Sequence, residues 1–365
     1  MLKTSVDVLK KIEKQGFEAY IVGGFVRDYY MNNTSVDVDI CTNATPYELS
    51  KIFKEALMPS TSYGSVTLIY LKVRYEITTF RKELRYKNRK PIEIEYINDL
   101  ESDLKRRDFT INTLCMNSDG EIIDLLNGRN DIKQKTIKMI GDPNLKLKED
   151  ALRILRAIRF ATILNFKLDG SLKKAINKNR KLLKTLSYTR KKEELTRILT
   201  SSNAIYGVSL LRELKLDRYL DVTGLSKIKI IDDILGIWAQ LDVIDKYPFN
   251  KTEREMIFKL NEVLKLKRID NYTVYKYGLY IAAIAASIKG IEKKMIIALN
   301  DNLPIKGRSD IAIDINEVCQ LLNKKPDKWL KKMFDHIEKK IVTKEIPNDK
   351  KIITNYIINN TKYIL

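Results

Sequence analysis

The sequence has few residues with sulfur or imidazole side chains. Its 365 residues include one histidine, His336, and three cysteines that form no C-x-x-C pair: Cys41, Cys115 and Cys319. One histidine excludes a multi-histidine metal site, a Ser-His-Asp triad and a His-Asp phosphohydrolase domain. The isolated cysteines support neither a zinc site nor a disulfide framework. We expect His336 to lie at the surface or at a domain boundary.

Long apolar segments are also absent. The longest run, Tyr277–Ile288, spans 12 residues, whereas a helix needs about 20 to cross a bilayer. Residues 1–17 fit an amphipathic helix and lack the continuous apolar core of a signal peptide. We therefore expect a soluble, cytoplasmic protein that does not act in a membrane.

Acidic residues are fewer than basic ones. Lysine and arginine total 67, and aspartate and glutamate total 47, which gives a formal net charge of +20 and a pI near 9.5. Such an excess attracts polyanions, with nucleic acid the first candidate and an anionic membrane the second. The lysines are scattered along the chain, so a general lysine bias is an alternative explanation, and charge alone does not decide the function.

Strand and helix signals alternate up to about Gly128, and helical patterns follow to the end of the chain. The length suggests about two to four structural units. The clearest boundary lies near residues 125–145, with weaker breaks near 200 and 270. The predicted elements are helices at 1–15, 24–31, 46–56, 109–114 and 148–164, strands at 17–22, 35–41, 65–70, 71–78 and 92–97, and a charged loop from residue 80.

The predicted strand at 35–41 carries two carboxylates on one face. Asp37 and Asp39 alternate with apolar residues, and successive side chains of a strand point to opposite faces. Two adjacent carboxylates repel each other unless a cation lies between them. Mg²⁺ suits such a pair because it prefers oxygen ligands and completes its shell with water and substrate phosphates. An isolated Asp-x-Asp is usually structural, so this hypothesis needs further support.

That support comes from the segment just before it. Gly23 and Gly24 follow a short apolar strand, and two glycines let backbone N–H groups approach an anion closely. Arg27 can donate a pair of hydrogen bonds to a phosphate, and we expect Asp28 to anchor the loop. Together these features favour a site for a metal and a nucleotide.

Glu76 leaves two interpretations open. It lies on the polar face of the predicted strand at 71–78, together with Lys72 and Arg74. It is either a third carboxylate that faces the metals or a partner in a salt bridge with one of these basic residues.

The predicted helix at 148–164 carries Asp150 followed by three arginines at three-residue spacing, Arg153, Arg156 and Arg159. Such spacing places them on one half of a helix, and arginine suits planar, bidentate recognition. An Asp–Arg pair could accept a hydrogen bond from an exocyclic amine and donate one to a ring nitrogen. Cytosine and adenine offer that order, whereas uracil and guanine would leave buried groups unpaired, at a cost of about 1–3 kcal/mol per group.

These segments resemble the five successive motifs of class II CCA-adding enzymes, in the superfamily of tRNA nucleotidyltransferases and bacterial poly(A) polymerases. The motifs are GGFVRD with DVD, EITTFR, RRDFTIN, EDALR and RKKEEL, and they span about residues 20–200 in family order. The resemblance implies an α+β protein, with a polymerase β-like nucleotidyltransferase head built on a mixed sheet and all-helical neck, body and tail. The implied domains are the head at 1–135, a base-recognising neck at 136–200, a body at 201–270 and a tRNA-binding tail at 271–365.

The resemblance also implies roles for individual residues. Asp37 and Asp39 would bind two Mg²⁺ ions, and Glu76 would join them as a catalytic carboxylate under the first interpretation above. The nucleotide would contact Gly23, Gly24, Arg27, Arg107, Asp108, Asp150, Arg153, Arg156 and Arg159, with Arg107 and Asp108 near the ribose and Asp150 with Arg153 reading the base.

The implied activity is addition of C, C and A to the 3′ end of tRNA from CTP and ATP, without a nucleic acid template. A-adding, CC-adding and poly(A)-adding enzymes are close alternatives. CC-adding members typically lack part of the segment before Arg106. This chain keeps that segment at residues 80–105, which argues for competence to add A. A non-catalytic RNA-binding or nucleotide-sensing protein is a more distant alternative, and either a monomer or a homodimer is expected.

Overall fold

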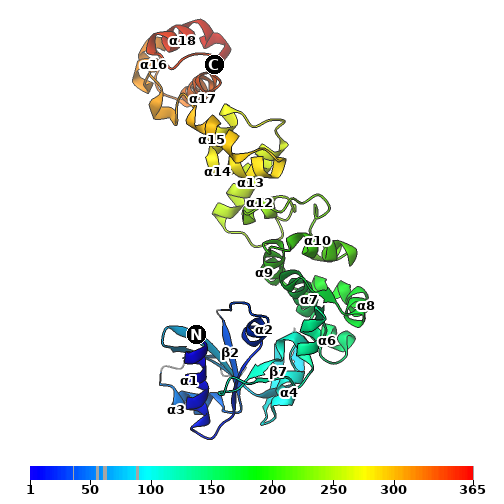
Figure 1. The fold of residues 1–365 in the computed structure, drawn as a ribbon. Helices are drawn as coiled ribbons and strands as arrows, with labels where there is room; N and C mark the ends of the chain where they lie inside the picture. Colours follow the sequence, from blue (N-terminus) through cyan, green and yellow to red (C-terminus); the bar gives the residue numbers. More distant parts are fainter. Residues whose placement is uncertain (36, 55–56, 61–63, 88–89, 365) are drawn as a thin grey trace. The chain divides into compact units, whose positions relative to one another are not determined.

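The computed structural model describes residues 1–35, 37–54, 57–60, 64–87 and 90–364, and the chain divides into two compact units, Met1–Asp221 and Val222–Leu365 (Figure 1). Val36, the end of the helix predicted at 46–56 and residues 88–89 of the predicted loop lie outside the described residues. The first unit contains a mixed sheet followed by helices, and the second is helical. The expected fold class is therefore confirmed, whereas the boundaries at 135, 200 and 270 stay predictions.

The sheet of the first unit has the strand order β3-β4-β5-β2-β1-β8-β9. Strands β2 and β5 run parallel, and the other neighbours are antiparallel. The strands are β1 (Ala19–Val22), β2 (Val38–Thr42), β3 (Leu57–Ser60), β4 (Ser65–Tyr70), β5 (Val73–Thr79), β8 (Cys115–Met116) and β9 (Ile122–Ile123). Val38 and Ile40 of β2 are buried and Asp39 between them is exposed, as the alternation predicts.

Short helices flank the sheet: α1 (Leu2–Glu13), α2 (Gly24–Tyr30), α3 (Pro46–Ile52), α4 (Leu100–Lys105) and α5 (Gly128–Lys133). Helix α3 begins with a capping box, in which Thr45 and Glu48 each bond the other's backbone N–H. The charged segment from residue 80, predicted as a loop before a strand, forms an antiparallel hairpin instead, β6 (Arg81–Lys87) with β7 (Lys90–Tyr96). The helix predicted at 109–114 is a single 3₁₀ turn, η2 (Thr110–Asn112).

The helical part of the first unit begins with α6 (Pro143–Glu149) and α7 (Leu152–Leu164). The single helix predicted at 148–164 is wrong at its start, because the chain is extended at Asp150, with φ −143° and ψ 106°. A short parallel pair, β10 (Thr136–Ile137) with β11 (Lys167–Leu168), joins the segments before and after these helices. The unit ends with α8 (Gly170–Asn179), η3 (Arg180–Thr185), α9 (Tyr188–Leu199), α10 (Ala204–Glu213) and α11 (Asp217–Leu220).

The second unit contains α12 (Ile234–Ala239), α13 (Lys251–Lys265), α14 (Asn271–Lys289), α15 (Lys293–Asp301), η4 (Arg308–Asp310), α16 (Ile315–Leu322), α17 (Lys328–Val342) and α18 (Lys350–Ile364). Its C-terminal core is built from the apolar faces of α16, α17 and α18. His336 on α17 is partly buried, and its Nε2 lies 2.8 Å from the Tyr356 hydroxyl.

Across the described part of the chain, we find no helix with the length and apolarity required to cross a membrane.

Candidate nucleotide and catalytic cleft

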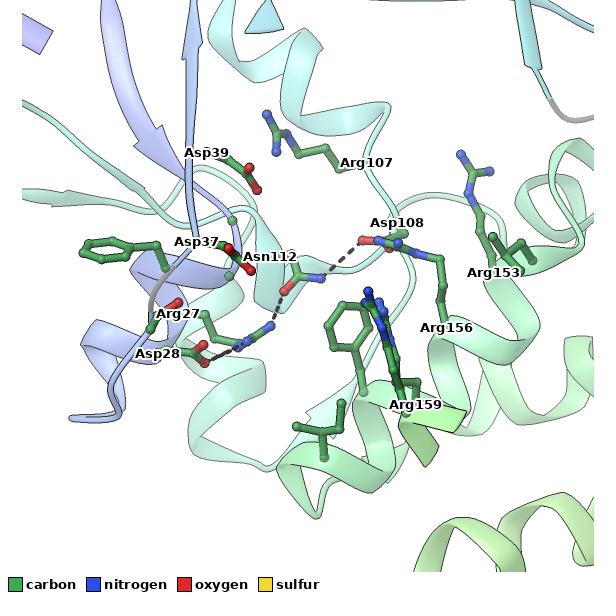
Figure 2. A pocket seen from close by; sticks show the side chains of 18 of the residues that line it. Arg27, Asp28, Asp37, Asp39, Arg107, Asp108, Asn112, Arg153, Arg156 and Arg159 are labelled. Atoms are coloured by element: carbon green, nitrogen blue, oxygen red, sulfur yellow. Dashed lines mark hydrogen bonds and ion pairs between the residues drawn. The ribbon is translucent and has the colours of Figure 1, made fainter. Parts of the chain in front are cut away.

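A cleft of about 610 Å³ lies within the first unit, between the sheet side and helices α7 and α9 (Figure 2). Eleven of the predicted site residues line it: Gly23, Gly24, Arg27, Asp37, Asp39, Arg107, Asp108, Asp150, Arg153, Arg156 and Arg159. The structure thus places the carboxylate segment and the arginine-rich helix around one cleft, although they are more than a hundred residues apart in the sequence. The individual roles of these residues stay predictions.

The carboxylates lie on the sheet side of the cleft. Asp39 projects from β2, and Asp37 directly precedes that strand. Glu76 on the parallel strand β5 is in register with Asp39, although it does not line the cleft itself. Desolvation and the negative charge of Glu76 raise the pKa of Asp39. The Arg107 guanidinium opposes this shift, and Asp37 adds to it. This crowding of negative charge creates a place where a cation would be stabilised.

The neighbours of Glu76 in the structure bear on its two interpretations. Among the described residues, neither Lys72 nor Arg74 forms an ion pair with Glu76. Glu76 is paired with Asp39 in the register of β5 and β2, and its charge raises the pKa of Asp39. Glu76 does not line the cleft, so the third-carboxylate interpretation stays a prediction.

The donor set fits Mg²⁺ bound together with a substrate. Within the described ranges, no three His, Cys, Asp or Glu side chains converge to hold an ion by themselves. Asp37 and Asp39 are both exposed at the cleft and offer carboxylate oxygens. Because Mg²⁺ usually takes one or two carboxylates and fills its shell with water and phosphate oxygens, two carboxylates suffice.

The glycine loop lies against these carboxylates. Gly23 precedes α2 with φ 83° and ψ −136°, a conformation that favours glycine. A Cβ atom at Gly23 would lie 3.6 Å from Asp39 Oδ2, so the backbone passes close to that carboxylate. The loop therefore brings a main chain without side-chain atoms to the place where the carboxylates are exposed.

Arg27 is held firmly by neighbouring side chains. It is only 6% exposed, and its Nε and Nη2 donate to Asp28 Oδ1 at 2.9 and 2.7 Å. Its Nη1 donates to Asn112 Oδ1 at 2.7 Å. Asp28 thus anchors the loop through Arg27, as its position in the sequence suggested, and the guanidinium is oriented without a ligand.

Asp108 connects the head side of the cleft to α7. Its Oδ1 accepts from the Phe109 N–H at 2.8 Å, and its Oδ2 accepts from Arg156 Nε at 2.7 Å (Figure 2). Burial by itself would raise the pKa of Asp108. The Arg156 charge, with hydrogen bonds from Arg156, Asn112 and the Phe109 N–H, lowers it below the ordinary value.

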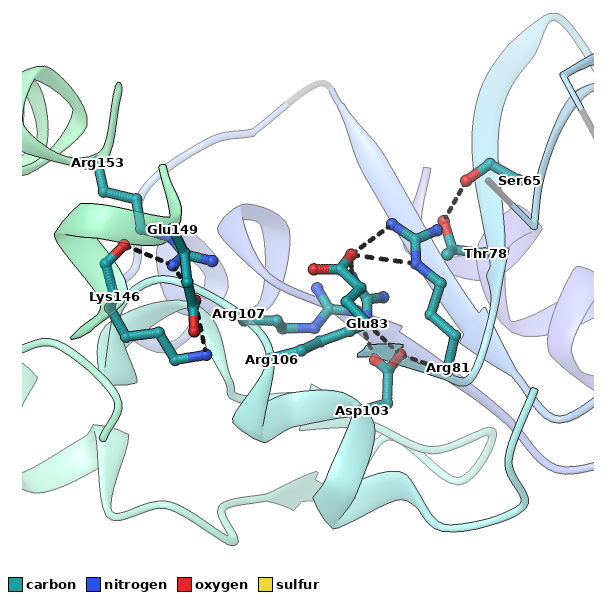
Figure 3. Close-up of polar contacts among 10 residues, drawn as sticks. All are labelled: Ser65, Thr78, Arg81, Glu83, Asp103, Arg106, Arg107, Lys146, Glu149 and Arg153. Carbon is teal, nitrogen blue, oxygen red and sulfur yellow. Dashed lines mark hydrogen bonds and ion pairs between the residues drawn. The ribbon is translucent and has the colours of Figure 1, made fainter. Parts of the chain in front are cut away.

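Arg153 is oriented toward α6. Its Nη1 donates to Glu149 Oε2 at 2.8 Å and to the Lys146 carbonyl at 2.9 Å (Figure 3). Asp150, in the break between α6 and α7, accepts from the Leu152 N–H at 2.9 Å. Asp150 and Arg153 both line the cleft. The break therefore presents the two predicted base-reading side chains at the start of α7, and not along one helical stripe.

Arg159 is buried, and its partner is Glu194 of the RKKEEL motif. Its Nε is 3.3 Å from Glu194 Oε2, and both side chains are less than a tenth exposed. Burial lowers the pKa of Arg159 to about 10, with Glu194 opposing the shift. Burial raises the pKa of Glu194, and Arg159, Arg156 and Arg197 oppose that shift.

Several lining residues were not predicted from the sequence: Phe25, Ser35, Glu83, Arg106, Asn112, Leu152, Phe160, Ile163 and Arg197. Phe160 supports the arginines, because the Arg159 guanidinium lies 4.5 Å from its ring centroid. Asn112 belongs to the RRDFTIN segment, so that segment contained a signal for it. Arg197 lies beyond the last motif, and nothing in the sequence distinguished it from other exposed arginines.

Known families match most of the chain. A model described as "Poly A polymerase head domain" matches residues 19–138. One described as "Probable RNA and SrmB- binding site of polymerase A" matches residues 165–220, and one described as "tRNA nucleotidyltransferase domain 2 putative" matches residues 241–357. The matches thus cover both compact units.

Individual proteins match over nearly the full length. A curated CCA-adding enzyme of Anoxybacillus flavithermus is 31% identical over an alignment of 387 positions, which covers 99% of this chain and 98% of the relative. The crystal structure of the Bacillus stearothermophilus CCA-adding enzyme with CTP has a TM-score of 0.85 and 25% identity, covering 99% and 98% of the two chains. The Thermotoga maritima CCA-adding enzyme complexed with tRNA shares the fold, with a TM-score of 0.68 and 20% identity over 98% and 94% of the chains. On this identity and coverage, the chain belongs to the CCA-adding enzymes.

Proposed function

We propose that this enzyme adds C, C and A to the 3′ end of tRNA, using CTP and ATP without a nucleic acid template and releasing pyrophosphate. The observation that carries the proposal is the shared cleft, in which Asp37 and Asp39 face the same space as Asp150 and Arg153. One group of side chains can act on phosphates and the other on a base. Membership of the CCA-adding enzymes supports this assignment.

The sheet side of the cleft would carry the phosphoryl transfer. Asp37 and Asp39 would hold two Mg²⁺ ions, which lower the pKa of the primer 3′-hydroxyl and stabilise the triphosphate and the leaving pyrophosphate. The Gly23–Gly24 backbone would approach the triphosphate closely. Arg27, fixed by Asp28 and Asn112, would offset negative charge without having to reorganise.

The helical side would choose the base. Asp150 can accept from the exocyclic amine of cytosine or adenine, and Arg153 can donate to the adjacent ring nitrogen. Glu149 and the Lys146 carbonyl hold Arg153, so its donor direction is restricted before a nucleotide enters. Uracil and guanine would face these groups with the opposite polarity, and the unpaired groups would disfavour their binding by about 1–3 kcal/mol each.

Basic side chains of the first unit would bind the tRNA backbone. The helical segment from α8 through η3 carries Lys173, Lys174, Lys178, Arg180, Lys181 and Lys184, all at least partly exposed. Neutralising phosphates with such groups makes binding depend on salt concentration. We further propose that the enzyme works in the cytoplasm, as a monomer or homodimer.

The experiment is nucleotide addition to tRNA trimmed to its discriminator base, with CTP, ATP or both. Addition of C, C and A only when both are present supports the proposal. Addition of A alone, of C alone or of a long A tail would identify one of the close alternatives. Incorporation of UMP or GMP at comparable rates would overturn the base-reading assignment.

A substitution separates the enzyme from a non-catalytic binder. Asp39→Asn should lower turnover by roughly 10²–10⁴-fold, the range for losing a group that acts on the reacting atoms, while tRNA binding persists. Asp7→Asn makes the same change at an exposed position of α1 and should leave both properties intact. Full turnover in Asp39→Asn would refute the catalytic assignment.

A further inference from the structure

Asp103 is a buried carboxylate next to the cleft that the chemistry above does not use. It lies on α4 and is 0% exposed. Its Oδ1 accepts from the Arg81 backbone N–H at 3.2 Å and from Arg106 Nε at 2.8 Å. Its Oδ2 accepts from Arg107 Nη2 at 3.2 Å. One oxygen thus fixes the carboxylate to its surroundings, and the other oxygen faces Arg107 (Figure 3).

The orientation of Asp103 is reinforced from the hairpin. Glu83 on β6 accepts from Arg81 Nη2 at 3.0 Å and from Arg106 Nη1 at 3.4 Å. The side chains of Glu83, Arg81 and Arg106 are all at most 15% exposed. Arg106 is therefore held between two carboxylates, and it can hold Asp103 Oδ1 in place while Oδ2 stays directed at Arg107.

Arg107 interacts both with Asp103 and with the exposed Asp39 of the cleft. It lines the cleft, and its side chain is 18% exposed. Figure 2 shows its guanidinium on the side of Asp39, and its positive charge opposes the upward shift in the pKa of Asp39. Its Nε is buried without a hydrogen-bond partner among the described residues. The guanidinium thus keeps donor capacity and has two negative neighbours that compete for it.

Burial decides this competition. Asp103 has no access to water. Losing Arg107 would leave Oδ2 without its donor, and Arg106, bound to Oδ1, would alone compensate the charge in a medium of low dielectric constant. Asp39 is exposed at the cleft, so its charge is less desolvated than that of Asp103 and depends less on a cationic partner. Arg107 therefore stays with Asp103. If Asp103 lost its charge, Asp39, whose pKa already responds to the Arg107 charge, would attract the guanidinium.

We propose that Asp103 is a positioning residue that holds the Arg107 guanidinium away from the Asp37–Asp39 pair and so keeps these carboxylates available to a divalent cation. The inference rests on the proposed function, in which that pair binds Mg²⁺. It goes further by assigning a role to a residue outside the cleft, which acts on the carboxylate pair through Arg107.

The test measures Mn²⁺ binding by electron paramagnetic resonance in the full chain, without nucleotide or tRNA. Asp103→Asn should weaken Mn²⁺ binding by about fivefold, the effect of one new solvent-accessible ion pair between Arg107 and Asp39. Arg107→Met should bind Mn²⁺ at least as tightly as the wild type. The double variant Asp103→Asn/Arg107→Met should match Arg107→Met, since no guanidinium is left to compete.

Asp99→Asn is the matched control, because Asp99 lies at the start of the same helix and caps it by accepting from the Ser102 N–H at 2.9 Å. It should leave Mn²⁺ affinity unchanged even if it lowers the melting temperature. If Asp103→Asn fails to fold, Asp103→Ser replaces it in the single and the double variant, because it also removes the charge and keeps a hydroxyl that can accept from the Arg81 N–H. Weaker Mn²⁺ binding in the double variant than in Arg107→Met overturns the proposal, as does unchanged affinity in folded Asp103→Asn. Failure of the wild type to bind Mn²⁺ would instead contradict the proposed function.

Discussion

The contact between Asp108 and Arg156 joins the two walls of the cleft, and Asp108→Asn tests what it contributes. The substitution preserves the shape of the side chain, and its oxygen can still accept from the Phe109 N–H. It removes the charge that pairs with Arg156, whose Nε lies 2.7 Å from Asp108 Oδ2. We expect both the stability of the first unit and nucleotide addition to fall.

The size of the stability loss follows from burial. A hydrogen bond to a charged partner contributes about 1.5–3 kcal/mol. The Asp108 side chain is only 10% exposed, but that of Arg156 is 35% exposed. Solvent therefore screens the pair, and we expect a loss of about 1.5–2 kcal/mol, in the lower half of that range.

The loss should also depend on pH. Because the pKa of Asp108 is lower in the folded protein than its ordinary value of 3.8, the unfolded chain binds the proton more readily. The stabilisation is thus complete above the unfolded pKa and disappears as the pH falls through the folded pKa. The gap between wild type and Asp108→Asn should be constant from about pH 6 to 8 and shrink below about pH 4.

The assay must report on the first unit alone. Hydrogen exchange on peptides from β1 and α7 does so, whereas tryptophan fluorescence reports the second unit, because Trp238 and Trp329 both lie there. Asp7→Asn provides the same charge change at an exposed site. If Asp108→Asn exchanges no faster than Asp7→Asn at pH 7, the contribution assigned to this contact is refuted.

Three further substitutions test other parts of the first unit. Gly207→Ala should destabilise the first unit by about 1–3 kcal/mol, because the added Cβ would lie 2.6 Å from both Ile198 Cγ2 and Thr162 Oγ1. Urea unfolding measures this loss, and unchanged stability would contradict the packing. Gly23→Ala should lower addition and stability together, by about 1–3 kcal/mol for the strained backbone, and a fully active variant would show that the loop tolerates a Cβ. Arg197→Gln should reduce the slope of log affinity for tRNA against log salt by about one unit if Arg197 contacts a phosphate, and an unchanged slope would exclude that contact.

The head of the fold was largely predictable because its strands follow simple rules. Val38 and Ile40 are buried on either side of exposed Asp39, so the period of two located β2 and one face of the site. The hairpin β6–β7 was missed in its first half. Arg81 and Glu83 are held there by an ion pair, and a strand stabilised by charges shows no apolar alternation.

The break before α7 was also missed, although the sequence contained a hint of it. The spacing of Arg153, Arg156 and Arg159 extends a helical pattern back to Asp150, and no proline or glycine interrupts it. An aspartate side chain, however, competes with helix formation by bonding nearby backbone N–H groups, as Asp150 does with Leu152. Periodicity detected the helix, whereas the chemistry of Asp150, two residues before α7, determined where it starts.

Contacts between distant segments, such as Arg156–Asp108 and Arg159–Glu194, were the part that local patterns could not supply. Each predicted cleft arginine has a protein partner; the pairs are Arg27–Asp28, Arg107–Asp103, Arg153–Glu149, Arg156–Asp108 and Arg159–Glu194. Such partners orient the guanidinium groups before a substrate arrives, so little reorganisation is needed when charge develops. For Arg107, we propose that its partner also keeps the guanidinium from binding the exposed carboxylates Asp37 and Asp39. A cleft with this many cations can therefore still present a negative site to a metal ion.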